Sequence, residues 1–166
     1  MPEEINRILT DSVADLLLTP SPDGDENLRA EGVSQERIHR VGNVMIDSLF
    51  TNLQRSKSSK IHSELGIHSD YAILTLHRPS NVDHKENFSQ IIGALEKIGK
   101  EIQLVFPVHP RAEKMAKTFG LYERLSAIPN IVLTGPVGYL DFVALMANSK
   151  MALTDSGGLQ LSLIHI

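Results

Sequence analysis

The feature that most constrains the fold is a set of short apolar runs that lack polar alternation and are separated by helical stretches. The strand-like runs are "YAILTLH" (71–77), "IQLVFPVH" (102–109), "NIVLTG" (130–135) and "MALTD" (151–155). Stretches with apolar residues at helical spacing lie between them, at 87–99, 111–119, 122–126 and 139–148. Strands without alternation are buried on both faces, and strands that alternate with helices are typical of parallel sheets. The sequence therefore predicts a Rossmann-like α/β fold, with a doubly wound parallel sheet.

The first forty residues contain too few elements to form a core of their own. We expect a buried strand at 14–20, closed by Pro20, a helix at 25–33 that ends at Gly32, and a short strand at 38–43. The apolar spacing of 44–53 then predicts another helix. We therefore expect residues 1–42 to be the C-terminal part of one Rossmann-like domain, and residues 43–166 to be the truncated N-terminal part of a second.

Composition excludes several functional classes. The formal net charge of −4 argues against a sequence-independent nucleic-acid partner, and the cluster "RSKSSK" (55–60) indicates a solvated linker or helix end. The chain has no cysteine, so disulfides and thiolate metal sites are excluded, and this is consistent with a cytoplasmic location. The histidines show no metal-ligand spacing and no apolar run is long enough to span a bilayer. We expect no metal, no cofactor and no membrane partner.

Chemically suited side chains follow each of the last four strands. They are 77–81 ("HRPSN"), 109–111 ("HPR"), 135–138 ("GPVG") and 155–158 ("DSGG"). Because the carboxyl ends of parallel strands share one edge of the sheet, and ligands bind there, these segments are expected to form one rim. Histidine, arginine, serine and glycine in such a rim favour an anionic, phosphate-bearing ligand.

Each motif also has a plainer interpretation. Gly157 and Gly158 at a helix start would let a phosphate approach backbone N–H groups, but they could equally form a turn without a ligand. His77 and Arg78 could bind a phosphate, or simply close a strand before a loop that Pro79 and Asn81 enforce. The same alternatives hold for His109 and Arg111. Glu3 and Glu4 are acidic residues of the kind that the helix dipole favours in a first turn.

Six ordered motifs carry a resemblance to a known family. They are "MPEEINRILTD", "VGNVMID", "LTLHRPSNVD", "PVHPR", "YLDFVALM" and "LTDSGGLQ", which run from Met1 to Gln160. Together they resemble the non-hydrolysing UDP-N-acetylglucosamine 2-epimerases. The resemblance implies a two-domain fold of the glycosyltransferase-B type, with UDP-N-acetylglucosamine or UDP as the ligand and often a homodimer as the full-length protein.

The resemblance also implies a reaction and residue roles. The family interconverts UDP-N-acetylglucosamine and UDP-N-acetylmannosamine by eliminating UDP to a glycal, exchanging the proton at sugar C2 and adding UDP again. By the resemblance Glu3 and His77 are catalytic, and Phe142 lines the uracil pocket. The remaining residues that it assigns to UDP binding are Arg78, His109, Arg111, Ser156, Gly157 and Gly158.

The chain departs from the family pattern at both ends. The family's N-terminal basic loop and its "GD" and "HVEAG"-like acidic motifs have no counterpart here, and Leu161 and Ser162 stand where the family has two glutamates. We therefore expect an interior fragment, truncated or frame-shifted after Gln160, that is inactive alone. The alternatives are a stand-alone UDP-sugar-binding module and a glycosyltransferase-B fragment without epimerase chemistry.

Overall fold

The computed structural model describes residues 2–163. The chain forms two compact units, Met1–Ser48 (unit 1) and Leu49–Ile166 (unit 2), which are described separately. Among the described residues, no helix combines the length and apolarity that crossing a bilayer requires.

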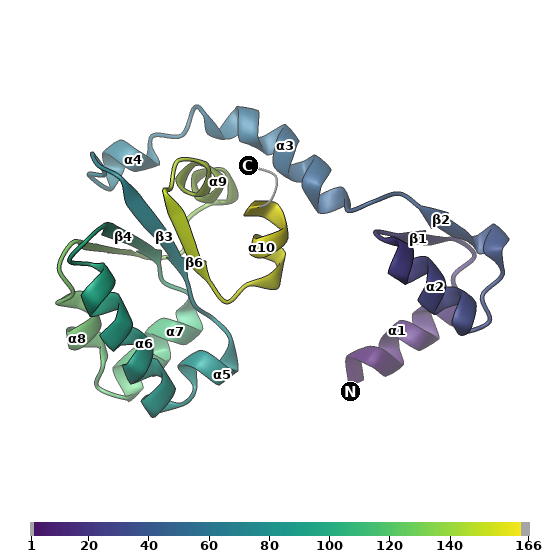
Figure 1. Cartoon of the computed structure of the whole chain (residues 1–166), viewed down its shortest axis with the longest axis horizontal. Helices are drawn as coiled ribbons and strands as arrows, with labels where there is room; N and C mark the ends of the chain where they lie inside the picture. Colours follow the sequence, from purple (N-terminus) through teal and green to yellow (C-terminus); the bar gives the residue numbers. More distant parts are fainter. Residues whose placement is uncertain (1, 164–166) are drawn as a thin grey trace. The chain divides into compact units, whose positions relative to one another are not determined.

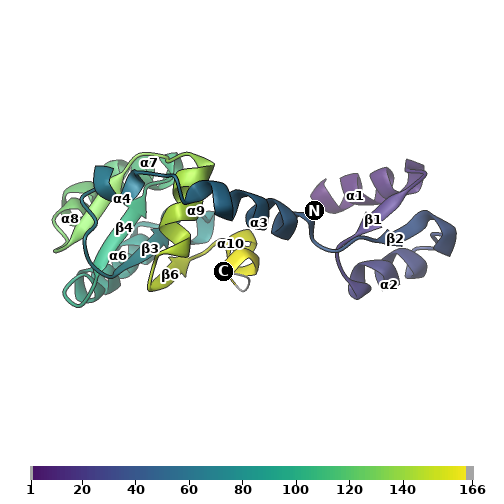
Figure 2. The same ribbon diagram turned by 90° about the horizontal axis from the view of Figure 1, so that it is seen from above.

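Unit 1 is built around two short parallel strands. Strand β1 (Leu17–Thr19) pairs with β2 (Ile38–Arg40), and Leu17 lies opposite Ile38. The other elements are α1 (Pro2–Val13), α2 (Pro22–Ala30) and the 3-10 turn η1 (Gln35–Arg37); Figure 2 shows the helices beside the strands. The buried core is small and consists of Leu17, Leu28 and Ile38.

Helix α2 begins three residues before the predicted start at residue 25. Ser21 has an extended backbone and its side chain accepts a hydrogen bond from the Gly24 N–H, while Pro22 occupies the first turn. A serine cap followed by proline starts a helix whatever the apolar pattern that follows. The predicted end at Gly32 is close to the observed one, and Gly32 has a φ of 87°, a conformation that favours glycine.

Unit 2 contains a four-stranded parallel sheet in the order β5-β4-β3-β6. The strands are β3 (Tyr71–Thr75), β4 (Gln103–Pro107), β5 (Ile131–Thr134) and β6 (Met151–Thr154). Every neighbouring pair is parallel, with Ile73 opposite both Val105 and Ala152. The predicted α/β class and parallel sheet are confirmed (Figure 1).

Both faces of the central strands β3 and β4 are buried, as strands without alternation require, whereas the outer strands β5 and β6 are partly exposed. On β3, Ala72 and Leu74 pack into one apolar cluster while Tyr71 and Ile73 pack into another, because successive side chains point to opposite faces. The first cluster includes residues of α6 (Lys85–Ile98), α7 (Pro110–Thr118) and α8 (Tyr122–Ser126). The second includes residues of α4 (Ile61–Glu64) and α9 (Tyr139–Ala147), which Figure 1 draws on the other side of the sheet from α6.

Three segments differ from the sequence-based expectation or extend it. Pro79–Val82 is a single helical turn, α5, and not a loop, because Arg78 is extended and proline occupies the first helical position. Helix α3 (Val44–Ser56) runs further than 44–53, and helix α10 (Gly157–Leu163) continues past Gln160. The expectation for the terminal segment 161–166 falls partly on residues 164–166, which lie outside the described residues.

Candidate functional site

The four rim segments follow parallel strands at the same edge of the unit 2 sheet. The hydroxyl oxygens of Thr75 and Thr154, the last residues of β3 and β6, lie 2.6 Å apart, and this contact joins the two strands where they end. Beyond them the chain turns into 77–81 on one side and 155–158 on the other. The edge that the topology predicts for a ligand is therefore also the place where these two segments meet.

Asp155 is the centre of this edge. Its Oδ2 accepts hydrogen bonds from the backbone N–H of His77 (3.0 Å) and Arg78 (2.9 Å), and from Asn81 Nδ2 (3.0 Å). Its Oδ1 lies 2.9 Å from His77 Nδ1. The carboxylate side chain is only 7% exposed. One carboxylate thus holds the whole turn between β3 and α5 against the end of β6.

Opposing effects act on the ionisation of Asp155. Burial acts to raise its pKa, while hydrogen bonds from the Arg78 backbone, the Asn81 side chain and the His77 backbone lower it, and the nearby His77 ring adds to the lowering. The hydrogen bonds prevail and the pKa lies below its ordinary value. Asp155 is consequently an anion at neutral pH, and its Oδ1 lies against the His77 ring.

The two histidines that follow β3 and β4 lie close together, and in each ring Nδ1 contacts the protein while Nε2 remains for a ligand. Their ring centroids are 5.8 Å apart. His77 uses Nδ1 toward Asp155, so its Nε2 is the nitrogen left for a ligand. His109 Nδ1 accepts a hydrogen bond from the Arg111 backbone N–H and caps α7, so in the neutral ring Nε2 carries the proton.

A hollow of about 190 Å³ opens beside these rings. His77 and His109 contribute to its wall, and the rest of its lining is mostly apolar: Thr75, Leu76, Pro107, Val108, Pro110, Pro136, Val137 and Phe142. It receives residues from the ends of β3, β4 and β5 together with Phe142 of α9. An apolar hollow with two imidazoles at its edge can hold a flat ring next to a charged group.

The Ser-Gly-Gly turn is organised from both sides. The Ser156 backbone N–H donates to Thr154 Oγ1 (2.9 Å), and Ser156 Oγ accepts from the Leu159 N–H (3.3 Å), so Ser156 caps α10. Arg78 Nε donates to the Asp155 carbonyl (2.7 Å), and its Nη2 lies 3.7 Å from the point that a Cβ on Gly157 would occupy. A guanidinium therefore lies against the glycine turn.

Two further predicted site residues have their own surroundings. Arg111 forms a fork with the carboxylate of Asp83, with Nε 2.9 Å from Oδ1, and this pairing lowers the pKa of Asp83. Glu3 lies on α1 of unit 1, where it is exposed. The structure brings together His77, Arg78, His109, Phe142 and the 156–158 turn within unit 2.

Sequence reasoning missed the residues that organise the site. Asn81 and Asp155 lie in the predicted rim segments but were assigned no role, and Asp83 was not predicted. Asp155 accepts from the backbone of His77 and Arg78, Asn81 donates to Asp155, and Asp83 pairs with Arg111. A signal existed for Asp155, because a carboxylate that directly follows a parallel strand lies at the ligand edge. Within the described part of the chain, no three histidine or acidic side chains gather as a metal site would require.

Comparison with known proteins decides the family. The family model described as UDP-N-acetylglucosamine 2-epimerase matches residues 1–163. The chain belongs to the UDP-N-acetylglucosamine 2-epimerase family. It is 39% identical to the UDP-N-acetylglucosamine 2-epimerase of Methanococcus maripaludis, over 96% of this chain and 45% of that protein. It is also 39% identical to a UDP-2,3-diacetamido-2,3-dideoxy-D-glucuronate 2-epimerase of Pseudomonas aeruginosa, over 96% of this chain and 44% of that protein.

A solved structure gives the same assignment. The crystal structure of the Methanocaldococcus jannaschii UDP-GlcNAc 2-epimerase in complex with UDP-GlcNAc and UDP matches 98% of this chain and 46% of that chain, with a TM-score of 0.82 and 38% identity. The predicted family and the glycosyltransferase-B type of fold are thereby confirmed. The chain spans about half the length of the relatives it matches.

Proposed function

We propose that this chain carries the UDP-binding rim and one acid/base helix of a UDP-N-acetylglucosamine 2-epimerase. The observation that carries the proposal is the Asp155-anchored turn, which places His77 and Arg78 beside the Ser156–Gly158 turn at the ligand edge of a parallel sheet. Membership of an epimerase family and the ligands of the Methanocaldococcus jannaschii relative support it.

Each part of the rim has a role in holding UDP. The diphosphate lies on Ser156, Gly157 and Gly158, where backbone N–H groups at the start of α10 and the Ser156 hydroxyl donate to phosphate oxygens. Arg78 supplies positive charge over the same turn. The uracil ring occupies the hollow against Phe142, next to His109. Arg111, held by Asp83, flanks the nucleotide from α7.

The reaction needs proton transfer at the sugar and stabilisation of the leaving group. UDP departs from C1 as the proton at C2 is removed, which leaves a glycal, and UDP is added again after a proton is returned to the opposite face of C2. In the protonated ring His77 Nε2–H donates to the departing diphosphate, and the Asp155 carboxylate beside Nδ1 stabilises that imidazolium. Glu3 is the acid/base carboxylate that this chain contributes.

The organisation of the complete protein follows from the same proposal. Residues 1–42 belong to a first Rossmann-like domain and residues 43–166 to a second, the UDP-binding domain. The full-length protein is a cytoplasmic homodimer. The chain of 166 residues binds UDP alone but does not epimerise, because the family's other acidic motifs are absent from it.

A titration of the purified chain with UDP tests the binding part. We expect saturable chemical-shift changes or heat, and a loss of affinity of about tenfold or more for Ser156→Ala and His77→Ala, because each removes a hydrogen bond to a charged ligand. His39→Ala, on β2 of unit 1, is the matched control and should leave UDP affinity unchanged. Absence of UDP binding by the folded wild-type chain would contradict the proposal. Turnover of UDP-N-acetylglucosamine by this chain would refute its predicted inactivity.

A second sugar nucleotide is a specific alternative substrate. The relative from Pseudomonas aeruginosa is as similar to this chain as the Methanococcus maripaludis enzyme, and its name gives a diacetamido-glucuronate substrate. Both substrates carry UDP, so both use the same rim. The affinities of the chain for the two sugar nucleotides, each compared with its affinity for UDP, distinguish the two substrates. Tighter binding of the diacetamido-glucuronate would make it the proposed substrate in place of UDP-N-acetylglucosamine.

A further inference from the structure

Helix α1, which carries Glu3, has little apolar packing to hold it within unit 1. None of its side chains is buried. Its large apolar residues are exposed: Ile5 (60%), Ile8 (45%), Leu9 (60%) and Val13 (82%). A twelve-residue helix without tertiary contacts is marginal in water. The direction in which α1 points must therefore be set by other contacts.

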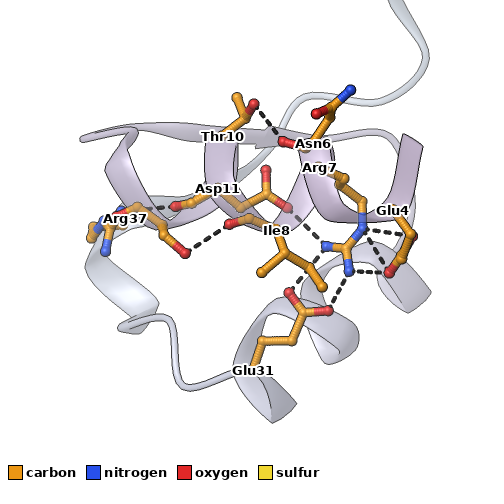
Figure 3. A network of polar contacts seen from close by, with 9 residues as sticks. Glu4, Asn6, Arg7, Ile8, Thr10, Asp11, Glu31 and Arg37 are labelled. Atoms are coloured by element: carbon orange, nitrogen blue, oxygen red, sulfur yellow. Dashed lines mark hydrogen bonds and ion pairs between the residues drawn. The ribbon is translucent and has the colours of Figure 1, made fainter. Parts of the chain in front are cut away.

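Those contacts centre on Arg7 (Figure 3). Its Nη1 and Nη2 form a fork with Glu31, at 3.0 and 2.6 Å, which joins the middle of α1 to the end of α2. The same guanidinium contacts Glu4 (Nη2 to Oε1, 2.6 Å) and Asp11 (Nη1 to Oδ2, 2.8 Å). Paired donors on planar carboxylates fix direction as well as distance, which a single ammonium cannot do.

A second arginine fastens only the far end of the helix. Arg37 Nη2 donates to the carbonyl oxygens of Asp11 (3.1 Å) and Ala14, at the C-terminus of α1. These contacts hold the C-terminal end of α1 and do not involve its N-terminal turn. Arg7 is the contact closer to Glu3, four residues along the same helix.

We propose that Arg7 is the positioning residue for Glu3: its fork to Glu31 fixes the N-terminal turn of α1, and hence the Glu3 carboxylate, relative to the rest of unit 1. This inference rests on the proposed function only in giving Glu3 its acid/base role. Glu4 and Asp11 complete the arrangement, because they occupy the guanidinium that could otherwise pair with Glu3 one helical turn away. Within the described part of the chain the Glu3 carboxylate has no ion-pair or hydrogen-bond partner, so it is left available for proton transfer.

The electrostatics agree with a tight network. Hydrogen bonds from Arg7 lower the pKa of Glu4 and of Glu31, and those two carboxylates raise the pKa of Arg7. The network therefore stays fully charged across the neutral range. Its side chains are partly exposed, 38% for Arg7 and 35% for Glu31, so the contact depends on geometry and on ionic strength.

Spin labels test the positioning directly, because the chain contains no cysteine and two introduced cysteines are unique. Nitroxides at Glu3→Cys and Glu26→Cys report the distance from position 3 to α2. We expect a narrow distance distribution in the otherwise unaltered chain, and a broad one after Arg7→Met or Glu31→Gln. In the unlabelled chain the same two substitutions should raise amide hydrogen exchange across α1 about three- to fivefold, with exchange in β1 and β2 unchanged.

The matched control removes a negative charge from α2 and leaves the Arg7–Glu31 ion pair unchanged. Asp23 lies in the first turn of α2, so Asp23→Asn weakens that helix but should leave the label distribution narrow. Unchanged exchange in β1 and β2 verifies that a variant still folds, and Glu31→Gln is the milder second change should Arg7→Met unfold unit 1. A distribution that stays narrow in the folded Glu31→Gln and Arg7→Met chains would overturn the proposal, and so would equal broadening in Asp23→Asn. Failure of the proposed function would show instead as absent UDP binding by unit 2, with the label result unaffected.

Discussion

Replacement of Asp155 by asparagine is the sharpest perturbation of the candidate site. The carboxylate accepts hydrogen bonds from two backbone N–H groups and from Asn81 Nδ2, its Oδ1 lies 2.9 Å from His77 Nδ1, and it is almost entirely covered by protein. Asparagine has the same shape but keeps only one acceptor oxygen and adds an NH₂ group. If the oxygen stays where Arg78 and Asn81 donate, the NH₂ faces His77 Nδ1 and forces the opposite tautomer.

The magnitude follows from the number of bonds lost. A hydrogen bond to a charged group contributes about 1.5–3 kcal/mol, and a donor left without its acceptor adds to the cost. Two contacts of His77 are lost or inverted, and the solvent-facing side of the ring lets water offset part of the loss. We expect Asp155→Asn to lower the free energy of unfolding of unit 2 by about 2–4 kcal/mol.

Urea unfolding followed by tyrosine fluorescence measures this in unit 2 alone. All three tyrosines (71, 122 and 139) lie in unit 2 and the chain has no tryptophan. Asp70→Asn is the matched control, since Asp70 pairs with Lys150 at 2.9 Å on the surface, with both side chains about two-thirds exposed, and should leave the midpoint unchanged. A loss below about 0.5 kcal/mol for Asp155→Asn would refute the assignment of Asp155 as the anchor of the site.

Acid provides a second check on the same carboxylate. The pKa of Asp155 is lower in the folded chain than its ordinary value, so the stability it contributes is fully present above that ordinary value, about 4, and is lost as the pH falls through the folded value. The difference between wild type and Asp155→Asn should therefore shrink on acidification below pH ~4. A difference that grows in acid would show that the sign of the shift is wrong.

Three further substitutions test the packing that supports the site, each by the same urea assay. Tyr71→Phe removes a buried hydroxyl that donates to the Leu145 carbonyl at 2.6 Å and should cost about 0.5–1.5 kcal/mol; a neutral result would show that the bond is not needed. Gly99→Ala should cost about 1–3 kcal/mol, since a Cβ there would lie 2.5 Å from the Pro129 carbonyl oxygen; an unchanged midpoint would mean that this turn yields freely. Phe88→Ala, at a fully buried position, should cost about 3–5 kcal/mol, and a loss under 1 kcal/mol would contradict its place in the core.

The sheet could be predicted from the sequence because its signal is local. Residues 71–74 and 104–106 are apolar at every position, a pattern typical of a strand covered on both faces. Parallel pairing then followed from the helices between them, and the shared edge of the rim segments followed from parallel pairing. The family resemblance suggested which ligand binds, and the spacing of apolar residues carries no information of that kind.

What could not be predicted depends on contacts between distant residues. Asp155 meets His77 and Arg78 across 78 and 77 positions of sequence, and Arg111 meets Asp83 across 28. Neither pairing has a spacing rule, because both depend on how β3 and β6, or α5 and α7, are placed. The helical turn at Pro79 was predicted as a loop for a different reason: proline both ends a preceding element and starts a helix, and only the backbone of Arg78 decides between them.

The Asn81–Asp155 hydrogen bond has a consequence for how this sequence can diverge. The two residues are 74 positions apart in the sequence. Loss of Asp155 leaves the Asn81 amide and the backbone N–H groups of His77 and Arg78 without their acceptor, whereas loss of Asn81 removes only one of the donors to Asp155. Substitutions at these positions should therefore be correlated among homologues, with a change at 155 accompanied by a compensating change at 81.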